Sequence, residues 1–570
     1  MLEGVEAACI IFCATMSKNL SELSGRKSLT NNLFERLGEL STATGTPDPA
    51  ALEALAKEFL IGKANTYGAA TFYDFMKPEN KGKKVYYCNG TACLTAGTQD
   101  GLKSELGKHF EESEIGHICC LGRCHENGAF QLGEKNHSAK SPEEIAEIAG
   151  SVPADLSAPS DRYHVGTHGT PVLTLETGDV EDFYAPFLAT LGNSPDDLLN
   201  EIKTSGMRGR GGAGFPLGLK LDSCKVVENE TKFIVLNADE GDPGAYSDRY
   251  LLEERPQAVL QGMMAAGFVV GAKWGVVYIR AEYPEAIRIV QAAIVDLTER
   301  GLLGKNIRDT GFDFEFKVIT ARGAYICGEE TALLSSIEGQ RPEVRVRPPY
   351  PTQEGLFNKP TVVNNVETLA AVPWIIRHGG AAYKAIGTDK SSGTKLVCLD
   401  SFFNQPGMYE VDMGTSLSLV IDELAGGFKS PVKAVQIGGP LGGMVPIHRI
   451  KDLTVDFESF AQNHFLLGHG SVVCIPEDFP MIKFIEHLLD FTAAESCGKC
   501  FPCRLGSVRG QELCEKAQGG DYKIDPTLFD DLLHTLETGS LCALGGGVPL
   551  PIRNALEYFK DELAPYFAKN

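Results

Sequence analysis

Residues 208–220 read RGRGGAGFPLGLK, and residues 233–249 read FIVLNADEGDPGAYSDR. The first stretch holds five glycines before Lys220, so its backbone N–H groups can approach a phosphate closely, and a helix starting after it would add its positive end. A glycine-rich run of this kind also fits a purely structural turn. The second stretch begins as a buried strand over residues 233–237. Asn237, Asp239 and Glu240 therefore lie at a carboxyl strand end, where α/β sheets bind ligands.

The residues that follow alternate between strand-like and helix-like segments. Helices are predicted over 255–270 and 284–294, and a strand over 275–279. This alternation indicates an α/β sheet domain, which we place at residues 171–390. It contains neither a Walker A motif nor a full dinucleotide fingerprint with a ribose-binding acid, so any nucleotide would be bound in another way.

Two further motifs of this domain carry polar side chains. GAYICGEETALLSSIEG at 323–339 places Glu329 and Glu330 at a probable helix start, where acidic groups are also stabilised without any ligand. VNNVET at 363–368 supplies Asn364, Asn365 and Thr368, whose amide and hydroxyl groups suit phosphate and ribityl hydroxyls.

The flanking segments predict further domains. Residues 1–30 form a lead without clear periodicity, and 151–170 are a linker rich in Pro, Ser and Gly. Residues 31–80 are helical, with a helix over 49–59 capped by Asp48. A strand at 84–88, a helix at 98–109 and a strand at 115–119 complete a domain over 31–150. Residues 391–475 form a small mixed domain of short strands, and 476–570 are mostly helical, with helical periodicity from 479 to 491.

The C-terminal cysteines have the spacing of a metal cluster. SCGKCFPC contains Cys497, Cys500 and Cys503 with two residues between neighbouring cysteines, and Cys542 follows about forty residues later. Three thiolates on a tight loop with a distant fourth are the ligand pattern of a [4Fe–4S] cluster. Zinc is the less favoured alternative, because zinc sites more often pair their cysteines as two C-x2-C units.

A second set of cysteines lies near the N-terminus. Cys88 and Cys93 form one pair and Cys120 and Cys124 another, which is the number of thiolates that a [2Fe–2S] cluster needs. Cys119 could replace Cys120, but the spacing to Cys124 favours Cys120. A zinc site and a redox disulfide pair are the alternatives.

Charge and hydropathy exclude other classes. The net charge of −22 over 570 residues argues against a nucleic-acid partner, which needs a basic face. No segment reaches the length of an uninterrupted apolar membrane span, and the short apolar run at 7–16 follows acidic rather than basic residues, unlike a secretory signal. We therefore expect a cytoplasmic protein without direct membrane insertion.

Seven motifs in order resemble the NADH-binding flavoprotein subunit of respiratory complex I, a module also found in NAD-linked formate dehydrogenases and in NAD-linked or electron-bifurcating hydrogenases. They are GRGGAGFP, NADEGDPG, YIRAEYPEA, GAYICGEETALLSSIEG, RPPYP, VNNVET and ESCGKCFPCRLG, the last with its later Cys542. NTYGAATFYDF, CNGTAC and CLGRC resemble the thioredoxin-like [2Fe–2S] subunit that accompanies this flavoprotein. The chain thus resembles both subunits fused.

The resemblance implies an α/β multi-domain fold: a thioredoxin-like [2Fe–2S] domain, a Rossmann-like FMN/NADH domain, a β-grasp-like domain and a helical bundle with [4Fe–4S]. It also implies FMN contacts from Gly209, Arg210, Gly211, Lys220, Asn237, Asp239, Glu240, Tyr325, Gly328, Glu329, Asn364, Asn365 and Thr368. Nucleotide contacts are implied for Phe215, Asp242, Glu330, Arg347 and Tyr350.

The chain departs from the family pattern at three places. Leu221 follows Lys220 where a Trp is usual, Asp242 replaces a common Glu, and the interval from Cys93 to Cys120 is shorter than usual. The first two changes bear on nucleotide affinity and on the choice between NAD and NADP, and the third bears on the geometry of the first cluster.

The resemblance implies hydride transfer between NAD(H) and FMN, followed by one-electron transfer through the clusters to or from a partner subunit. The chain itself then supplies no general base, and Glu240 and Glu330 lie near the flavin and nicotinamide. Of the possible partners, a formate dehydrogenase is our first expectation, with a hydrogenase, a bifurcating complex or complex I as alternatives. A non-catalytic, cluster-bearing subunit that senses NAD is the alternative of another class.

Overall fold

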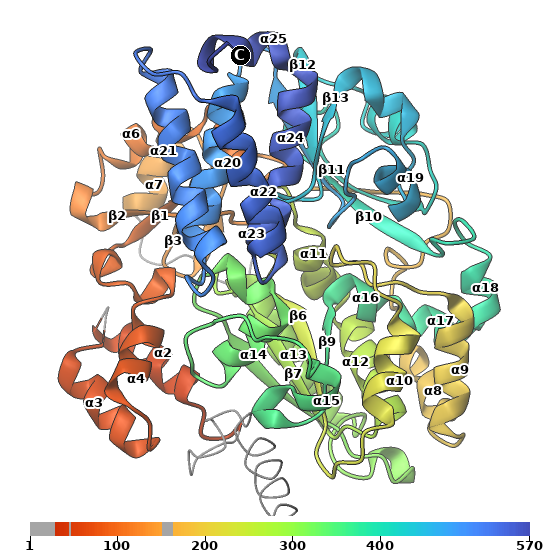
Figure 1. Ribbon diagram of the computed structural model, residues 1–570. Coiled ribbons are helices and arrows are strands. Elements are labelled where there is room, and N and C mark those ends of the chain that lie inside the picture. Colours follow the sequence, from red (N-terminus) through yellow and green to blue (C-terminus); the bar gives the residue numbers. More distant parts are fainter. Residues whose placement is uncertain (1–28, 45–46, 151–162, 570) are drawn as a thin grey trace, which may run out of the picture.

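The computed structural model describes residues 29–44, 47–150 and 163–569. Three β-sheets and a C-terminal group of helices pack together, with the N-terminal helices at one corner (Figure 1). Most of the predicted N-terminal lead and the first part of the predicted linker, residues 151–162, lie outside the described residues. None of the described helices is both long and apolar enough to cross a membrane.

A four-stranded parallel sheet forms the centre of the α/β part. Its strand order is β8-β7-β6-β9, where β6 is Phe233–Ala238, β7 Trp274–Ile279, β8 Glu315–Thr320 and β9 Thr361–Asn365. Strands β6 and β7 are almost wholly apolar and buried, as expected when both faces of a parallel sheet are covered. The predicted strands at 233–237 and 275–279 are thereby confirmed.

Alternate side chains of β6 enter two different hydrophobic cores. Ile234 and Leu236 pack with the core around helices α12 and α13, whereas Phe233 and Val235 pack on the opposite face. The helices of this part of the chain are α8 Val180–Thr190, α9 Pro195–Ser205, α10 Leu217–Lys225, α11 Ser247–Glu254, α12 Pro256–Val270, α13 Pro284–Glu299, α14 Glu330–Ile337, α15 Pro351–Glu354, α16 Val366–Ala370, α17 Val372–His378 and α18 Gly380–Lys384.

The second face of this sheet is covered partly by the N-terminal helices α2 (Leu33–Thr44), α3 (Pro49–Glu58) and α4 (Lys63–Ala70). The side chain of Asp48 accepts hydrogen bonds from the backbone N–H groups of Ala50 and Ala51, so the predicted cap of α3 is confirmed. The Tyr73 hydroxyl donates to Ser336 Oγ of α14 at 2.8 Å. These helices were expected to belong to the domain over 31–150, yet their apolar faces are buried against the central sheet.

The first cysteine set lies on a small mixed sheet of order β2-β1-β3-β4. Its strands are β1 Val85–Cys88, β2 Ile115–Ile118, β3 Phe130–Leu132 and β4 Lys135–His137, and its helices are α5 Thr91–Thr95, α6 Gln99–Leu106 and α7 Pro142–Gly150. Parallel pairing of β1 with β2 brings the ends of both strands, and the cysteine loops that follow them, to the same edge.

The third sheet has six strands in the order β13-β12-β14-β10-β11-β5. Its strands are β5 His164–His168, β10 Thr394–Leu399, β11 Gly407–Asp412, β12 Val432–Ile437, β13 Gly443–Pro446 and β14 Ser471–Pro476, and α19 Phe457–Gln462 packs beside them. Strand β5 corrects the prediction of a linker through residue 170. It pairs in parallel with β11, whereas the Pro and Ser residues that signalled a linker precede it.

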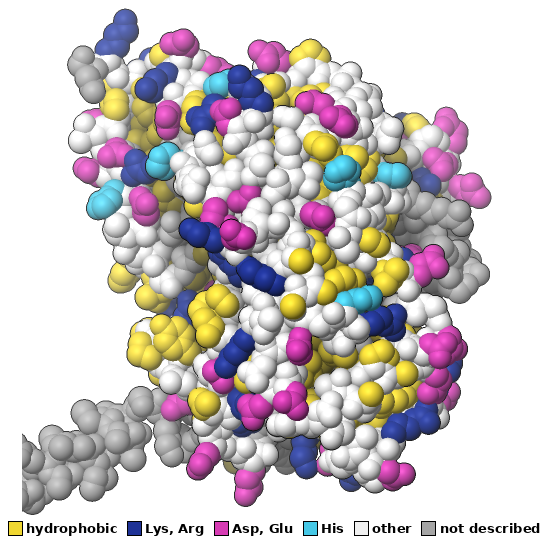
Figure 2. Space-filling model, turned by 90° about the vertical axis from the view of Figure 1, so that its right-hand side faces the viewer, with side chains coloured by type: hydrophobic (Ala, Val, Ile, Leu, Met, Phe, Trp, Pro, Cys, Tyr) yellow, Lys and Arg dark blue, Asp and Glu magenta, His cyan; other side chains and the backbone are white. Residues whose placement is uncertain are grey.

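Helices complete the chain, as predicted: α20 Met481–Glu495, α21 Ser507–Gln518, α22 Pro526–Gly539, α23 Ala543–Gly547, α24 Pro549–Tyr558 and α25 Lys560–Leu563. They share a buried core around Phe484, Leu488 and Leu533. On the face of the molecule in Figure 2, Lys and Arg side chains are interspersed with Asp and Glu, so this face carries no continuous basic surface.

Candidate functional site

The candidate site lies where the strand order of the central sheet reverses. Strands β7 and β8 follow β6 on one side, and β9 lies on the other. Parallel pairing places Asn237 opposite Asn365 and Leu236 opposite Asn364, so polar residues of both strands meet at the carboxyl edge. Open α/β sheets bind ligands at such a switch point.

The glycine-rich loop crosses this edge. The backbone N–H of Arg210 donates to Thr368 Oγ1 at 2.9 Å, and a Cβ atom on Gly211 would lie 3.0 Å from Cβ of Asn365. Gly212 has φ +116°, which L side chains rarely adopt. Helix α10 starts at Leu217, directly after the loop. The loop therefore brings backbone N–H groups of glycines, which have no side chain to block a ligand, and the start of α10 next to Asn364 and Asn365 of β9.

Two polar side chains at this edge have an unused atom. Nδ2 of Asn364 and Oδ2 of Asp239 are buried and have no hydrogen-bond partner. Burial raises the pKa of Asp239 well above its usual range. Asn237 instead donates through Nδ2 to the carbonyl of Gly328 at 2.7 Å. Because unpaired buried polar atoms are costly, the edge fits a ligand rich in hydrogen-bonding groups, as a flavin is.

Charged groups line the side of this edge near α14. Lys220 Nζ donates to the carbonyl of Val363 at 2.8 Å and forms an ion pair with Glu330 at 3.1 Å. Arg347 pairs with the other oxygen of Glu330 at 3.0 Å. Glu329 caps α14 by accepting from the N–H groups of its first turn, as its position predicted. Glu330 thus lies between two cations.

The remaining residues predicted to contact the nucleotide lie in two groups. Phe215 and Tyr350 are about half exposed, at 53% and 54%, and so present apolar surface for stacking. Tyr325 donates its hydroxyl to Asp242 Oδ1 at 2.8 Å, and its ring meets Phe491 of α20 edge-on.

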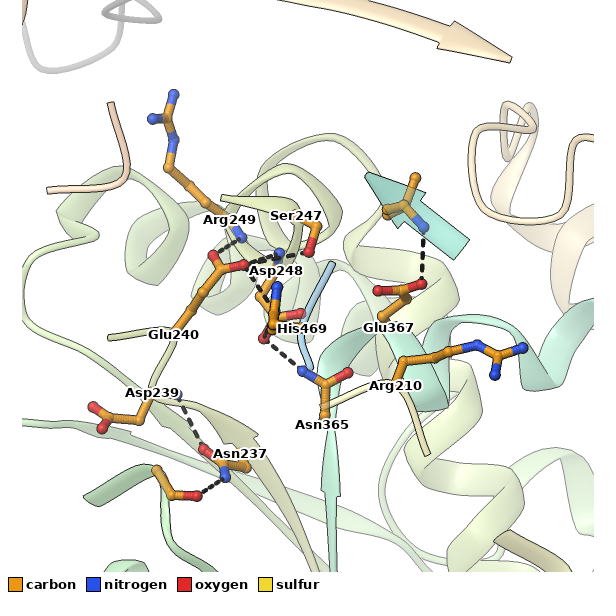
Figure 3. Close-up of polar contacts among 12 residues, drawn as sticks. Arg210, Asn237, Asp239, Glu240, Ser247, Asp248, Arg249, Asn365, Glu367 and His469 are labelled. Carbon is orange, nitrogen blue, oxygen red and sulfur yellow. Dashed lines mark hydrogen bonds and ion pairs between the residues drawn. The ribbon is translucent and has the colours of Figure 1, made fainter. Parts of the chain in front are cut away.

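Two predicted flavin contacts point elsewhere. The guanidinium of Arg210 donates to the carbonyls of Thr394 and Ser392, and therefore joins the loop to the third sheet. The carboxylate of Glu240 accepts from the backbone N–H groups of Asp248 and Arg249. Figure 3 shows both side chains directed away from Asn237. These contacts satisfy the carboxylate of Glu240 but leave Nη1 of Arg210 without a partner. Flavin contacts from both residues stay predictions.

Glu240 belongs to a buried network that the sequence did not reveal. His469, from the loop before β14, lies 3.2 Å from Glu240 Oε1 and 3.9 Å from Asp248 Oδ2. Asn365 Nδ2 donates to Asp248 Oδ2 at 2.7 Å (Figure 3). The three titratable side chains are close enough to hold a metal ion. However, Glu240 already accepts four hydrogen bonds, including one from the Tyr283 hydroxyl, which fill its lone pairs, so we interpret the group as an ion-pair network.

The network favours a charged imidazole. Burial opposes the charge, but the carboxylates of Asp248 and Glu240 raise the pKa of His469 to about 9. Burial, and next the charge of Asp248, raises the pKa of Glu240 to about 7, whereas His469 opposes that rise. Because Asp248 accepts a hydrogen bond from Asn365 Nδ2, the network holds the side chain of Asn365 in place at the end of β9.

The C-terminal cysteines converge as their spacing predicted. Cys500 and Cys497 lie close enough to the Cys503 thiol to add to the rise of its pKa, which burial chiefly causes. Burial raises the pKa of the Cys542 thiol to about 12, and the neighbouring Glu329, Cys497 and Cys503 add to the rise. The cluster ligands and the α14 side of the pocket are thus close together.

The N-terminal cysteines also converge. Cys120 Sγ lies 3.6 Å from Cys124 Sγ, which favours Cys120 over Cys119 as the partner of Cys124. A hydrogen bond with Cys93 is the largest cause that lowers the pKa of Cys88, to about 6. Helix α20 reaches this loop, since His487 Nε2 lies 3.0 Å from Thr91 Oγ1. The same helix leads on to Cys497.

None of the described cysteines forms a disulfide. Two cysteine sets of the types that bind iron and sulfide therefore lie on the same chain as the polar carboxyl edge of the central sheet. Metal roles for these eight cysteines, and ligand roles for the pocket residues, remain predictions.

Three family models match successive parts of the chain. Residues 21–152 match a thioredoxin-like [2Fe-2S] ferredoxin, 202–374 the Nuo51 FMN-binding domain, and 483–566 the NADH-ubiquinone oxidoreductase-F iron-sulfur binding region.

Individual proteins are similar over most of the chain. The NADP-reducing hydrogenase subunit HndC of Solidesulfovibrio fructosivorans is 42% identical over 66% of this chain and 78% of its own length. The F subunit of the NADH-quinone oxidoreductase of Escherichia coli is 39% identical over 66% and 85%. The NAD-reducing hydrogenase HoxS subunit alpha of Cupriavidus necator is 32% identical over 94% and 92%. A crystal structure of an NAD⁺-reducing [NiFe]-hydrogenase in the H2-reduced state superimposes with a TM-score of 0.84 at 28% identity, covering 95% of this chain and 93% of that one.

Proposed function

The chain belongs to the family of flavoprotein subunits of NADH-quinone oxidoreductases and NAD-reducing hydrogenases, and from that premise we propose that it is the NAD(H)-reacting subunit of a cytoplasmic, hydrogenase-like assembly. It is an oxidoreductase acting on NAD(H), with FMN, one [2Fe–2S] and one [4Fe–4S] cluster. The observation that carries the proposal is the polar carboxyl edge of β6 and β9, crossed by the glycine-rich loop, on the same chain as both cysteine sets.

The pocket residues divide between the two ends of a flavin nucleotide. Lys220 and the start of α10 supply positive charge suited to the phosphate, and the glycine loop supplies backbone N–H groups. Asn364 and Asp239 have unused atoms for the polar ring edge or the ribityl chain. When bound, the flavin supplies the conversion between two-electron nicotinamide chemistry and one-electron cluster chemistry.

The nicotinamide nucleotide is assigned to the more exposed side of the same pocket. Phe215 and Tyr350 offer aromatic surface there, and Arg347 offers a cation for a phosphate. Glu330 holds Lys220 and Arg347 in place through its two oxygens. The chain therefore binds, orients and shields its ligands, and needs no general base of its own.

Electrons leave or enter at the C-terminal cluster. Phe501, between two of the cysteines, is 72% exposed, and Leu505 and Leu541 are also largely exposed apolar residues of this region. Exposed apolar groups gathered at one place mark an interaction surface. We assign this surface to a partner subunit that carries its own iron–sulfur cluster, because these exposed residues lie next to Cys500, Cys503 and Cys542 in the chain.

A hydrogenase is the partner that similarity supports best. The relative and the solved structure that each match more than nine-tenths of this chain, and so cover both cysteine sets, come from NAD-reducing hydrogenases. The formate dehydrogenase expected first from the sequence has no such support and becomes the second candidate. The unpaired cysteines of the described residues suit a reducing compartment, which supports a cytoplasmic location.

The test is to purify the tagged chain anaerobically from its native host and identify the subunits that accompany it. We expect a hydrogenase catalytic subunit and reduction of NAD⁺ that depends on H2. Co-purification of a molybdenum or tungsten subunit, with formate-dependent NAD⁺ reduction, would replace the hydrogenase assignment. Membrane subunits of a quinone oxidoreductase would replace it with complex I.

A further inference from the structure

Arg280 joins the α/β domain at 171–390, called the flavin part of the chain below, to the loop that carries Cys119, Cys120 and Cys124. It follows β7 directly and is buried. Its Nη2 atom donates to the carbonyls of Cys120 at 2.8 Å and Cys119 at 3.1 Å. Its Nη1 atom donates to the carbonyl of Glu240, in the loop that starts at the end of β6. A single guanidinium therefore ties together two loops that serve different cofactors.

The carbonyls that Arg280 contacts belong to particular peptide groups. The carbonyl of Cys119 and the N–H of Cys120 form one peptide group, and the carbonyl of Cys120 and the N–H of Leu121 form the next. The second carbonyl belongs to Cys120, a predicted cluster ligand whose Sγ lies 3.6 Å from Cys124 Sγ. The guanidinium therefore places a buried positive charge against the backbone of a predicted ligand and of the residue before it. Charge-assisted hydrogen bonds of this kind polarise the peptide groups that they reach.

Other groups of the flavin part hold the same loop. Arg249 Nη1 donates to the carbonyl of Gly122 at 2.6 Å, and the backbone N–H of Gly244 donates to Cys124 Sγ at 3.2 Å. Gly122 packs so closely on Tyr283 that a Cβ atom there would lie 2.7 Å from the ring. The loop is therefore fixed from outside its own domain.

Arg280 also lies close to Asp239, at the carboxyl edge of the central sheet. Asp239, with its unused oxygen, lines a small cavity together with Cys119 and Arg280. The side chain of Arg280 is also paired with Glu282 at 2.8 Å, and both are almost fully buried. The other oxygen of Glu282 has no hydrogen-bond partner. Because the carboxylate is so close to Arg280, its negative charge partly cancels the positive charge of the guanidinium.

We propose that Arg280 is a positioning residue that raises the reduction potential of the [2Fe–2S] site by placing a buried positive charge against the two peptide groups on either side of Cys120. The inference rests on the proposed function, since it needs a cluster at these cysteines. Reduction adds negative charge to a cluster, and the net charge nearby helps to set its potential. The positive charge of Arg280 therefore favours the reduced state, and the negative charge of Glu282 disfavours it.

The test is an EPR-monitored redox titration of the full chain in wild-type, Arg280→Gln, Arg280→Lys and Glu282→Gln forms. In Arg280→Gln we expect the [2Fe–2S] potential to fall by at least about 59 mV, equivalent to a tenfold change in the one-electron equilibrium. Arg280→Lys keeps the charge but cannot span two carbonyls with a planar fork, so its shift should be smaller. Glu282→Gln should shift the potential upward. The [4Fe–4S] potential should not move in any form.

The matched control is Arg300→Gln, an exposed arginine of the same domain that is paired with Asp296 at 2.9 Å. It should leave both potentials unchanged. An Arg280→Gln chain that holds its cluster at the wild-type potential would overturn the inference, as would equal shifts of both clusters. If Arg280→Gln fails to assemble the cluster, an unchanged or lower potential in Glu282→Gln overturns it. A wild-type chain without any [2Fe–2S] signal would instead refute the proposed function.

Discussion

Lys220→Met tests the assignment of the phosphate end of the pocket. Lys220 lies in the first turn of α10 and reaches β9 through the carbonyl of Val363. A hydrogen bond to a charged group contributes about 1.5–3 kcal/mol, which corresponds to a loss of FMN affinity of about 10- to 150-fold. Because the side chain is still 22% exposed and is shared with Glu330, we expect the lower part of this range.

The assay is titration of FMN into the flavin-free chain, followed by quenching of flavin fluorescence. Lys225→Met is the matched control, since Lys225 lies on the same helix and pairs with Asp196 at 2.6 Å, away from the pocket edge. It should bind FMN like the wild type. Glu330→Gln should bind FMN more tightly, because it releases Lys220 from its ion pair. If Lys220→Met and Lys225→Met bind FMN equally well, the phosphate does not lie at Lys220.

The remaining predictions concern the clusters and the buried ion pairs. Cys500→Ser should abolish the [4Fe–4S] EPR signal and keep the [2Fe–2S] signal, and loss of both would mean that the two sites do not assemble independently. Glu367→Gln leaves Lys395 buried without its partner and should cost about 3–5 kcal/mol, seen as a lower apparent melting temperature, whereas Glu367→Leu combined with Lys395→Met should restore most of it. Since the pKa of His469 is raised to about 9 from an ordinary value of 6.5, its stabilisation is complete below about pH 6.5 and is lost as pH rises through about 9. The melting temperature of the wild type should therefore fall between pH 7 and 10 more steeply than that of His469→Gln, and parallel curves would show that the imidazole is not charged.

Local signals predicted the regular elements well. Asp48 and Pro49 marked the start of α3, and the apolar run from Phe233 marked β6. Helix α13 continues to Glu299, five residues beyond its predicted end, because the buried positions Val290, Ala293 and Leu297 keep helical spacing. Strand β5 was missed because only its pairing with β11, more than two hundred residues away, makes a strand of it.

The pocket could be assembled from the sequence only in part. Motifs identified Asn237 and Asn365, but their adjacency depends on β9 pairing beside β6 rather than beside β8. The direction of the Arg210 side chain depends on carbonyls of the third sheet, which no local pattern reveals. A lone His such as His469 carries no signal of its own in one sequence. Arg280 lies in the YIRAEYPEA motif, but the carbonyls that it contacts are far away in the chain, so the motif alone does not reveal its partners.

The central claim is that one chain holds a flavin between two iron–sulfur sites, and it is tested most directly on the full chain purified anaerobically. Flavin, iron and sulfide should be present in the ratio of one FMN to one [2Fe–2S] and one [4Fe–4S] cluster. NADH should bleach the flavin absorption, and dithionite should develop the EPR signals of both clusters. A chain that retains neither flavin nor iron, or whose flavin does not respond to NADH, would contradict the account.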